Sequence, residues 1–438
     1  MTEIPLPRAF ANATDNHTAS RWPTGGNQAR LDPIYTPILR PRFRLKRGAK
    51  IFTIGSCFAR HIETHLQQFG FDVPMLSLRV PPEEFSPAPA ILDKFTPLSA
   101  LQEIERTLAM IKNPRQIDRI SDEVLFPIMD KKVIDLELRE FVPVTKQRAR
   151  QRRREIFNVF KNVFDADCVV ITLGLVECWL DKKTGRAIQE APHALAMRRA
   201  KDRFVLKILD VQETLKAAEH AVRLLLKHGR PDMNILLTVS PVPLRVTFSG
   251  MDVVVANAYS KAVLRTVAQT LYDKFERVDY FPSYEMVTVS RSADVWEGDL
   301  IHVNDRFVAN IVEVLVRDYL DTPAPTSLGH SELMRLDHHF DPRPPLGWVA
   351  YVASLTSRCD GNDAPQRSPL VLLENGVELG PTHELHDRIA QLGGGGYSFW
   401  KGTLYFSTSD GSDPNTNGRT YTVATRAQEH GTASGKSM

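Results

Sequence analysis

The chain has 438 residues, of which 42% are hydrophobic and 24% are charged, and its formal net charge at pH 7 is +3. These values are typical of globular proteins, the length suggests two folded units plus tails, and the small charge excludes a global field that would attract nucleic acid or anionic membranes. The N-terminus lacks an apolar signal core and no run of about 18 apolar residues appears, so we expect no membrane span and a cytoplasmic location.

The first 48 residues are rich in turn formers and lack clean periodicity, so we predict an irregular N-terminal arm over 1–48. Between residues 49 and 322, short apolar runs alternate with stretches whose apolar residues recur at helical spacing. They predict strands at 50–54, 168–174, 234–243 and 278–281, and helices at 55–70, 98–112, 147–164, 211–228, 256–275 and 304–320. Such alternation is typical of a mostly parallel sheet covered by helices on both faces, so we predict a three-layer α/β/α domain over 49–322.

The composition changes after about residue 325. A Pro-rich stretch predicts a linker over 323–345, and short apolar runs between Gly, Asn, Asp and Ser clusters predict a small β-rich module over 346–426. Residues 427–438 are predicted to be a disordered tail. The aromatic residues and Asn/Asp-rich turns of the module would suit contacts with carbohydrate, although the same composition also builds ordinary β-turns.

Basic residues cluster locally at 40–47 and 146–154. The second run could grip phosphate or an anionic glycan, but we favour the solvated face of a helix. The four cysteines are scattered without CxxC spacing, which argues against a zinc site and a disulfide framework, so we predict no metal and no cofactor. For Cys57 we favour a small buried residue that packs the first helical turn over a reactive thiol.

Ser56 follows Gly55 at the junction between the strand at 50–54 and the next helix. A serine hydroxyl is a weak nucleophile that needs a base, a partner to orient the base, and donors for the oxyanion. The carboxyl ends of strands in an open α/β sheet are where ligands bind, and a helix N-terminus there faces developing negative charge. The alternative interpretation is that Ser56 is only the N-cap of the helix.

Asp299 and His302 are three residues apart in WEGDLIHVND, just before the last predicted helix at 304–320. On a turn, side chains at this spacing share a face, so the carboxylate can hold the imidazole and stabilise the imidazolium. An Asp-x-x-His pair alone often arises by chance. Combined with the Gly-Ser junction, it predicts a triad of Ser56, His302 and Asp299.

The string IGSCFARHI at 54–62 resembles the signature of the GSCFA family, which is related to the SGNH/GDSL hydrolases. Further strings match in the family's order, and they are TLGLVECW (172–179), TVSPVPL (238–244), NAYSKAVLR (257–265), DYFPSYEMV (279–287) and DLIHVND (299–305). The resemblance covers roughly residues 48–320 and implies an SGNH/flavodoxin-like fold. It places Ser56 at the serine of the GDS block, and Asp299 and His302 at the C-terminal DxxH block.

The resemblance includes a departure at the oxyanion site. The wider superfamily uses a Gly-x-Asn-Asp block whose asparagine donates to the oxyanion, whereas residues 174–177 here read GLVE. Gly174 therefore matches the block, but an ionised glutamate only accepts hydrogen bonds. Either the oxyanion hole relies on the backbone N–H of Ser56 and another donor such as Asn257, or the substrate is held differently.

Three further positions have two interpretations each. Glu177, beside Trp179, could bind a sugar hydroxyl or be the structural partner of a nearby arginine. His193 is a pocket residue by the family's tendency to place a histidine here, or a surface histidine. Ser240 ends a predicted strand, and we expect a turn former before Pro241 rather than a second nucleophile.

The sequence thus predicts a serine-dependent ester hydrolase or O-acyltransferase that acts through an acyl-enzyme. By resemblance to related polysaccharide-directed branches, the expected substrate is an O-acyl, preferably O-acetyl, ester of a carbohydrate or a small molecule, with no nucleic-acid partner. The alternative is a non-catalytic glycan-binding or scaffold protein on a decayed hydrolase fold. The absent asparagine favours that alternative, and retention of all three triad residues speaks against it.

Overall fold

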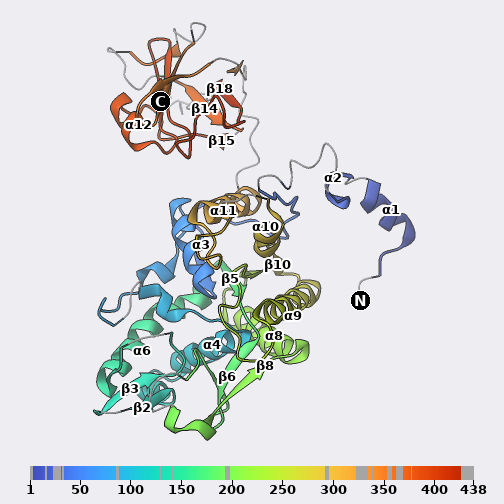
Figure 1. The fold of residues 1–438 in the computed structure, drawn as a ribbon, viewed down its shortest axis with the longest axis vertical. Coiled ribbons are helices and arrows are strands. Elements are labelled where there is room, and N and C mark those ends of the chain that lie inside the picture. The colour runs from blue at the N-terminus through green and yellow to red at the C-terminus, as the bar shows by residue number, and fades with distance from the viewer. Residues whose placement is uncertain are drawn as a thin grey trace, which may run out of the picture. The chain divides into compact units, whose positions relative to one another are not determined.

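The computed structural model divides the chain into two compact units, Met1–Asp321 and Thr322–Met438, which Figure 1 shows as a ribbon. It describes residues 3–14, 17–22, 31, 34–84, 88–128, 130–139, 142–192, 198–291, 295–321, 334–336, 339–352, 358–361, 368–375 and 377–425. Within these ranges, every helix is too short or too polar to cross a lipid bilayer.

The first unit is built on a sheet of four parallel strands in the order β1-β5-β9-β10. The strands are β1 (Ile51–Ile54), β5 (Cys168–Leu173), β9 (Asn234–Val239) and β10 (Val278–Tyr280). All residues of β1 and β5 are buried, as expected of parallel strands covered on both sides. The prediction of an α/β domain with a mostly parallel sheet is confirmed.

One face of this sheet is buried against four long helices. They are α4 (Pro97–Lys112), α6 (Lys146–Phe160), α8 (Val211–His228) and α9 (Val253–Lys274). Phe52, Val169 and Ile235 point to this face and share one hydrophobic cluster with apolar residues of all four helices. This cluster is the larger part of the core.

The opposite face is covered by α3 (Cys57–Gln68), α10 (Ser283–Val289) and α11 (Asp305–Tyr319). Ile51, Val170 and Leu236 point to this side, because successive side chains of a strand alternate between its faces. Hydrophobic periodicity predicted α3 and α11, but it missed the short helix α10.

Local capping signals set several of these boundaries. Thr96 caps α4 by accepting the backbone N–H of Ser99 at 3.1 Å, and Asp210 caps α8 by accepting that of Glu213 at 2.8 Å. The strand predicted to run to residue 243 ends at Val239, since the chain leaves the sheet at the Ser-Pro pair that follows.

Two small antiparallel sheets, which periodicity did not predict, extend the first unit. One has the order β2-β3-β4 and the other β7-β6-β8. Their strands are β2 (Leu125–Pro127), β3 (Lys132–Asp135), β4 (Val144–Thr145), β6 (Glu177–Asp181), β7 (Arg186–Ile188) and β8 (Phe204–Ile208). Phe126, Ile188 and Phe204 belong to one cluster that joins the two sheets. Because β6 starts directly after the end of β5, this extension forms a wall beside the carboxyl edge of the central sheet.

The basic run at 146–154 forms much of α6, and its prediction as a solvated face is wrong for the inward residues. The side chains of Arg152 and Arg153 are each 1% exposed. Arg153 pairs with Asp135 at 2.5 Å and Glu103 at 3.1 Å, and Arg152 pairs with Glu84 at 2.9 Å. These carboxylates come from segments far from α6 in the sequence, so the basic run alone could not reveal them.

The N-terminal segment is only partly irregular. It contains α1 (Leu6–Thr14) and α2 (His17–Ser20), and α1 buries none of its residues. A proline in the first turn of a helix is tolerated, which is why Pro7 does not prevent α1. Further along, Arg42 donates its backbone N–H to Asp279 at 2.8 Å, so this part of the arm is fastened to the central sheet.

The described part of the second unit contains two antiparallel four-stranded sheets, in the orders β11-β18-β14-β15 and β12-β13-β17-β16, and the helix α12 (His386–Leu392). The strands are β11 (Met334–Arg335), β12 (Asp341–Arg343), β13 (Gly347–Tyr351), β14 (Leu370–Glu374), β15 (Val377–Glu378), β16 (Tyr397–Trp400), β17 (Thr403–Phe406) and β18 (Tyr421–Thr425). The first two lie inside the segment predicted as a linker, because β12 pairs with β13 despite its central Pro342. The predicted tail at 427–438 lies outside the described residues.

Candidate active site

Ser56 lies at the carboxyl end of β1 and at the N-cap position of α3. Its backbone is extended, with φ −82° and ψ −169°, and its side chain makes no capping hydrogen bond. The hydroxyl oxygen lies 3.4 Å from that of Ser240, which follows the end of β9. The hydroxyl is therefore not used as a helix cap, although the residue is only 5% exposed.

Two glycines bring the strand ends close together at this edge. A Cβ atom on Gly55 would lie 2.6 Å from the Cβ of Thr172 in β5. On Gly174, which follows β5, a Cβ would lie 2.6 Å from the carbonyl oxygen of Phe95. Neither contact is possible with a side chain, so both positions require glycine for close backbone approach.

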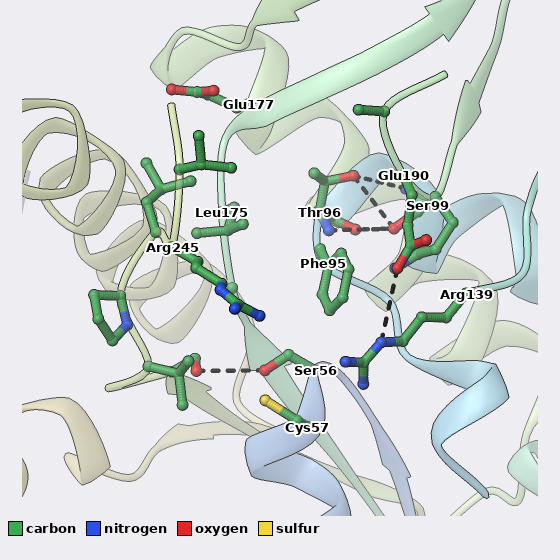
Figure 2. Close-up of a pocket in the computed structure, with 18 of the residues that line it drawn as sticks. Ser56, Cys57, Phe95, Thr96, Ser99, Arg139, Leu175, Glu177, Glu190 and Arg245 are labelled. Atoms are coloured by element: carbon green, nitrogen blue, oxygen red, sulfur yellow. Dashed lines mark hydrogen bonds and ion pairs between the residues drawn. The ribbon is translucent and has the colours of Figure 1, made fainter. Parts of the chain in front are cut away.

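A cavity of about 350 Å³ opens above Ser56 (Figure 2). Residues from the ends of β1, β5 and β9, the β6–β7 wall and the turn before α11 line it, among them Ser56, Ser240, Trp179, Phe248 and His302. Trp179 and Phe248 meet edge to face, with ring centroids 5.4 Å apart. The structure thus brings Ser56 and His302, which are far apart in the sequence, to one cavity.

His302 is held by the carboxylate predicted to orient it. Its Nδ1 lies 2.6 Å from Oδ2 of Asp299, and Oδ1 of Asp299 accepts the backbone N–H groups of Ile301 and His302, each at 2.9 Å. The hydrogen bond from the His302 N–H, followed by those from Ile301 N–H and the imidazole, lowers the pKa of Asp299 to about 2. The carboxylate is therefore ionised at neutral pH and favours a proton on Nδ1, which leaves Nε2 as the basic atom.

The turn that carries this pair includes an unusual backbone conformation. Leu300 has φ +56°, a left-handed value that is uncommon for a residue other than glycine, and the residue is 73% exposed. The two backbone hydrogen bonds to Asp299 close the turn around it. Such conformations are kept where the surroundings determine them, and they cluster at functional sites.

Within the described residues, no hydrogen bond joins Ser56 to His302; the Ser56 hydroxyl faces Ser240 instead. Catalytic hydrogen bonds are often long before substrate binds, so this arrangement is compatible with a triad that closes on the substrate. Ser240 was predicted to be a turn former, and the structure adds that its hydroxyl is buried and faces the candidate nucleophile.

Of the other predicted site residues, two line the cavity. Gly174 and Glu177 line the cavity, but Glu177 accepts hydrogen bonds from the Thr247 hydroxyl and, at 3.2 Å, from the Phe248 backbone, so it holds a loop and not an arginine. Asn257 is not among the described residues that line the cavity. Its side-chain oxygen accepts the Leu244 N–H at 3.1 Å, which makes it a support of the cavity wall. His193 lies outside the described residues.

Lys261 is a site residue that the sequence reasoning missed. It is 1% exposed, and its ammonium donates to the carbonyls of Gly174 at 2.9 Å and Val242 at 2.8 Å. Burial lowers its pKa to about 7. Lys261 therefore ties together two loops that line the cavity. In the sequence, the one indication of this role was the position of Lys261 next to the apolar stripe of the helix predicted at 256–275.

Cys57 also lines the cavity and is half-buried, not fully buried as predicted. Burial, and secondly the charge of Asp93, raise the pKa of its thiol. A thiol with a raised pKa is a poor source of thiolate, so Ser56 is the better candidate nucleophile. No cluster of metal-ligating side chains occurs in the described ranges.

Comparison with known families identifies a match over the first unit. The family model described as "GSCFA family" matches residues 50–315, which run from the start of β1 into α11. The match therefore spans the central sheet, Ser56 and the Asp299–His302 turn. No curated protein matches the chain.

Proposed function

This chain belongs to the GSCFA family, and we propose that it is a serine-dependent esterase or O-acyltransferase with an SGNH-like site, in which Ser56, His302 and Asp299 form the triad. One observation carries the proposal. A serine hydroxyl that does not cap its helix shares a cavity with an imidazole whose Nδ1 is held by an ionised carboxylate. That arrangement contains a nucleophile, a base and an orienting group.

In the proposed reaction, Nε2 of His302 takes the proton from Ser56 as its oxygen bonds to the ester carbonyl carbon. The π electrons of the ester C=O bond move onto the carbonyl oxygen and form the oxyanion. When the C=O bond forms again, the bond between the carbonyl carbon and the alcohol oxygen breaks, and the alcohol leaves with the proton from His302. The resulting acyl-enzyme is attacked by water or by an alcohol, from which His302 takes a proton. That proton returns to Ser56 as the acyl group leaves. Water gives hydrolysis, and a sugar hydroxyl gives acyl transfer.

Ser240 is our candidate for the donor that replaces the absent asparagine. The backbone N–H of Ser56 lies at the positive end of α3 and supplies one donor. The hydroxyl of Ser240, 3.4 Å from the attacking oxygen, is close enough to reach the oxyanion that forms beside it. Asn257 is less suitable, because it is absent from the described cavity lining and its side-chain oxygen is engaged by the Leu244 N–H.

An acetylated sugar suits the proposed site. Trp179 and Phe248 provide apolar ring surfaces, against which the face of a sugar ring can pack, and Glu177 and Gln189 provide polar groups beside them. The alternative function, glycan binding without catalysis, is favoured by one observation, the contact of Ser56 with Ser240 in place of His302.

A fluorophosphonate probe tests the proposal, with covalent labelling read by intact mass. Wild type should be labelled once, Ser56→Ala should not be labelled, and His302→Ala should be labelled much more slowly. Ser20→Ala, which removes an exposed serine of α2, is the matched control and should behave as wild type. If folded wild type remains unlabelled, the triad is not assembled, and non-catalytic glycan binding becomes the better explanation.

A further inference from the structure

Two arginines approach the serine end of the cavity from different walls. Arg139 follows β3, and Arg245 lies in the loop between β9 and α9. In Figure 2 both guanidinium groups point from opposite sides toward the space above Ser56. The family resemblance did not point to either residue, and the proposed triad chemistry uses neither of them.

Arg139 is fixed in place by carboxylates. Its Nη1 lies 2.7 Å from Oδ2 of Asp93, whose side chain is 0% exposed, and its Nε lies 3.7 Å from Glu190. Burial raises the pKa of Asp93 to about 6, opposed mainly by the charges of Arg60 and Arg139. The positive charge of Arg139 is thus largely matched, while its planar group is held at the cavity wall.

Arg245 differs because no ion pair among the described residues involves it. Its side chain is exposed to the cavity, but the loop that carries it is anchored. Leu244 donates its N–H to Asn257, and the carbonyl of Val242 accepts from Lys261. An anchored loop therefore presents a guanidinium without an ion pair toward the candidate nucleophile.

The two acidic residues of the described cavity lining are each engaged by another group. Figure 2 shows Glu177 on the side of the cavity opposite Ser56 and the carboxylate of Glu190 beside Arg139. Glu177 is engaged by Thr247 and Phe248, and Glu190 lies against Arg139. Both carboxylates therefore have partners of their own, and neither is paired with Arg245 among the described residues.

We propose that the site accepts an ester that carries a carboxylate close to the scissile bond, and that Arg245, assisted by Arg139, binds this carboxylate. The inference deepens the proposed function and rests on it. A guanidinium binds a planar carboxylate through two parallel hydrogen bonds. Of the two guanidinium charges, that of Arg139 is already matched by Asp93, so that of Arg245 remains, which suits a carboxylate monoanion.

Two aryl esters of equal chain length test this selectivity: 4-nitrophenyl hydrogen glutarate, which carries a terminal carboxylate, and the uncharged 4-nitrophenyl pentanoate. Wild type should prefer the glutarate, and Arg245→Gln should lower kcat/KM for the glutarate roughly tenfold or more and for the pentanoate less than about twofold. Arg245→Lys should retain part of the preference, because it keeps the charge but not the planar fork. Arg223→Gln, an exposed arginine of α8, is the matched control.

An equal loss for both esters in Arg245→Gln would overturn the inference, since Arg245 would then act on the oxyanion or the fold. So would a wild-type preference for pentanoate. If wild type hydrolyses neither ester, the proposed function fails, and binding still decides the inference. In the Ser56→Ala protein, titration calorimetry should detect binding of monomethyl glutarate but not of dimethyl glutarate. Adding Arg245→Gln to this variant should abolish the binding of monomethyl glutarate. Equal binding of both compounds would refute carboxylate recognition.

Discussion

Two buried cations of the first unit illustrate opposite ways of placing positive charge in a protein interior. Arg153, in the ionic cluster beside α4 and α6, is surrounded by Asp135 and Glu103, and these charges raise its pKa against the effect of burial. In the described structure the ammonium of Lys261, under the cavity floor, donates hydrogen bonds only to the carbonyl oxygens of Gly174 and Val242, and burial lowers its pKa to about 7.

The difference between these two cations indicates a structural role for the cluster around Arg153 and a positioning role for Lys261. In the ionic cluster, removing one member leaves its partners buried and uncompensated, so most of the effect should appear in stability. At the cavity floor the charge is already uncompensated, and what Lys261 contributes is the placement of two loops. Its removal should therefore affect catalysis at least as much as stability.

The largest expected effect is on the ionic cluster. Glu103 is 2% exposed and lies 2.9 Å from Lys94 and 3.1 Å from Arg153. Glu103→Gln should lower the free energy of unfolding by about 3–5 kcal/mol, because two buried cations lose a shared counter-charge. Urea denaturation would measure this. Glu105→Gln, on the same helix but 40% exposed, should change it by less than about 0.5 kcal/mol, and similar values for the two variants would contradict the comparison.

The next effect concerns the candidate oxyanion donor on the cavity side. Ser240→Ala should lower kcat roughly 100-fold, equivalent to about 2.7 kcal/mol of transition-state stabilisation, with little change in stability. Hydrolysis of an activated aryl ester would measure it. The buried Ser121, whose hydroxyl donates to the Ile117 carbonyl at 2.7 Å outside the cavity, supplies the control variant Ser121→Ala. Unchanged kcat in Ser240→Ala would remove Ser240 from the mechanism.

Lys261→Met tests the positioning role directly. Two carbonyls lose their donor, which costs about 1–3 kcal/mol, but removal of an uncompensated buried charge offsets part of it. We therefore expect a smaller loss of stability than for Glu103→Gln, together with slower fluorophosphonate labelling of Ser56. Lys216→Met, at an exposed position of α8, is the control. A loss of stability equal to that of Glu103→Gln, with unchanged labelling, would assign Lys261 to the structural class.

The same contrast explains what could be predicted from the sequence. The strands β1, β5 and β9 follow from apolar runs, and Ser56 and His302 follow from motifs that are local in the chain. Hydrophobic burial and capping act over a few residues, so one sequence reveals them.

The partners of buried charges could not be predicted in this way. The run at 146–154 reads as a solvated basic face until Glu84, Glu103 and Asp135 are brought against it from other elements. For the same reason Arg245 was not recognised, since its importance depends on the fold placing its loop above Ser56. Long-range pairing leaves no periodic signal in a single chain.

Expressed per pH unit, the smallest of these effects is the contribution of Lys261 to the pH dependence of stability. The pKa of this lysine is about 7 in the folded state and has its ordinary value of 10.5 in the unfolded state, so between these two pH values the unfolded state binds more protons. Unfolding free energy should then rise with pH across the window from about 7 to 10.5, by up to about 1.4 kcal/mol per pH unit from this group. The difference between wild type and Lys261→Met, measured by urea denaturation at several pH values, isolates this contribution.

The pair Arg153 and Glu103 should contribute no slope between pH 7 and 10.5, because the pKa of Arg153 is raised above this window and the pKa of Glu103 is lowered below it. A wild-type curve parallel to that of Lys261→Met would mean that Lys261 keeps its proton throughout, and that the two carbonyls compensate its charge as fully as the carboxylates compensate Arg153.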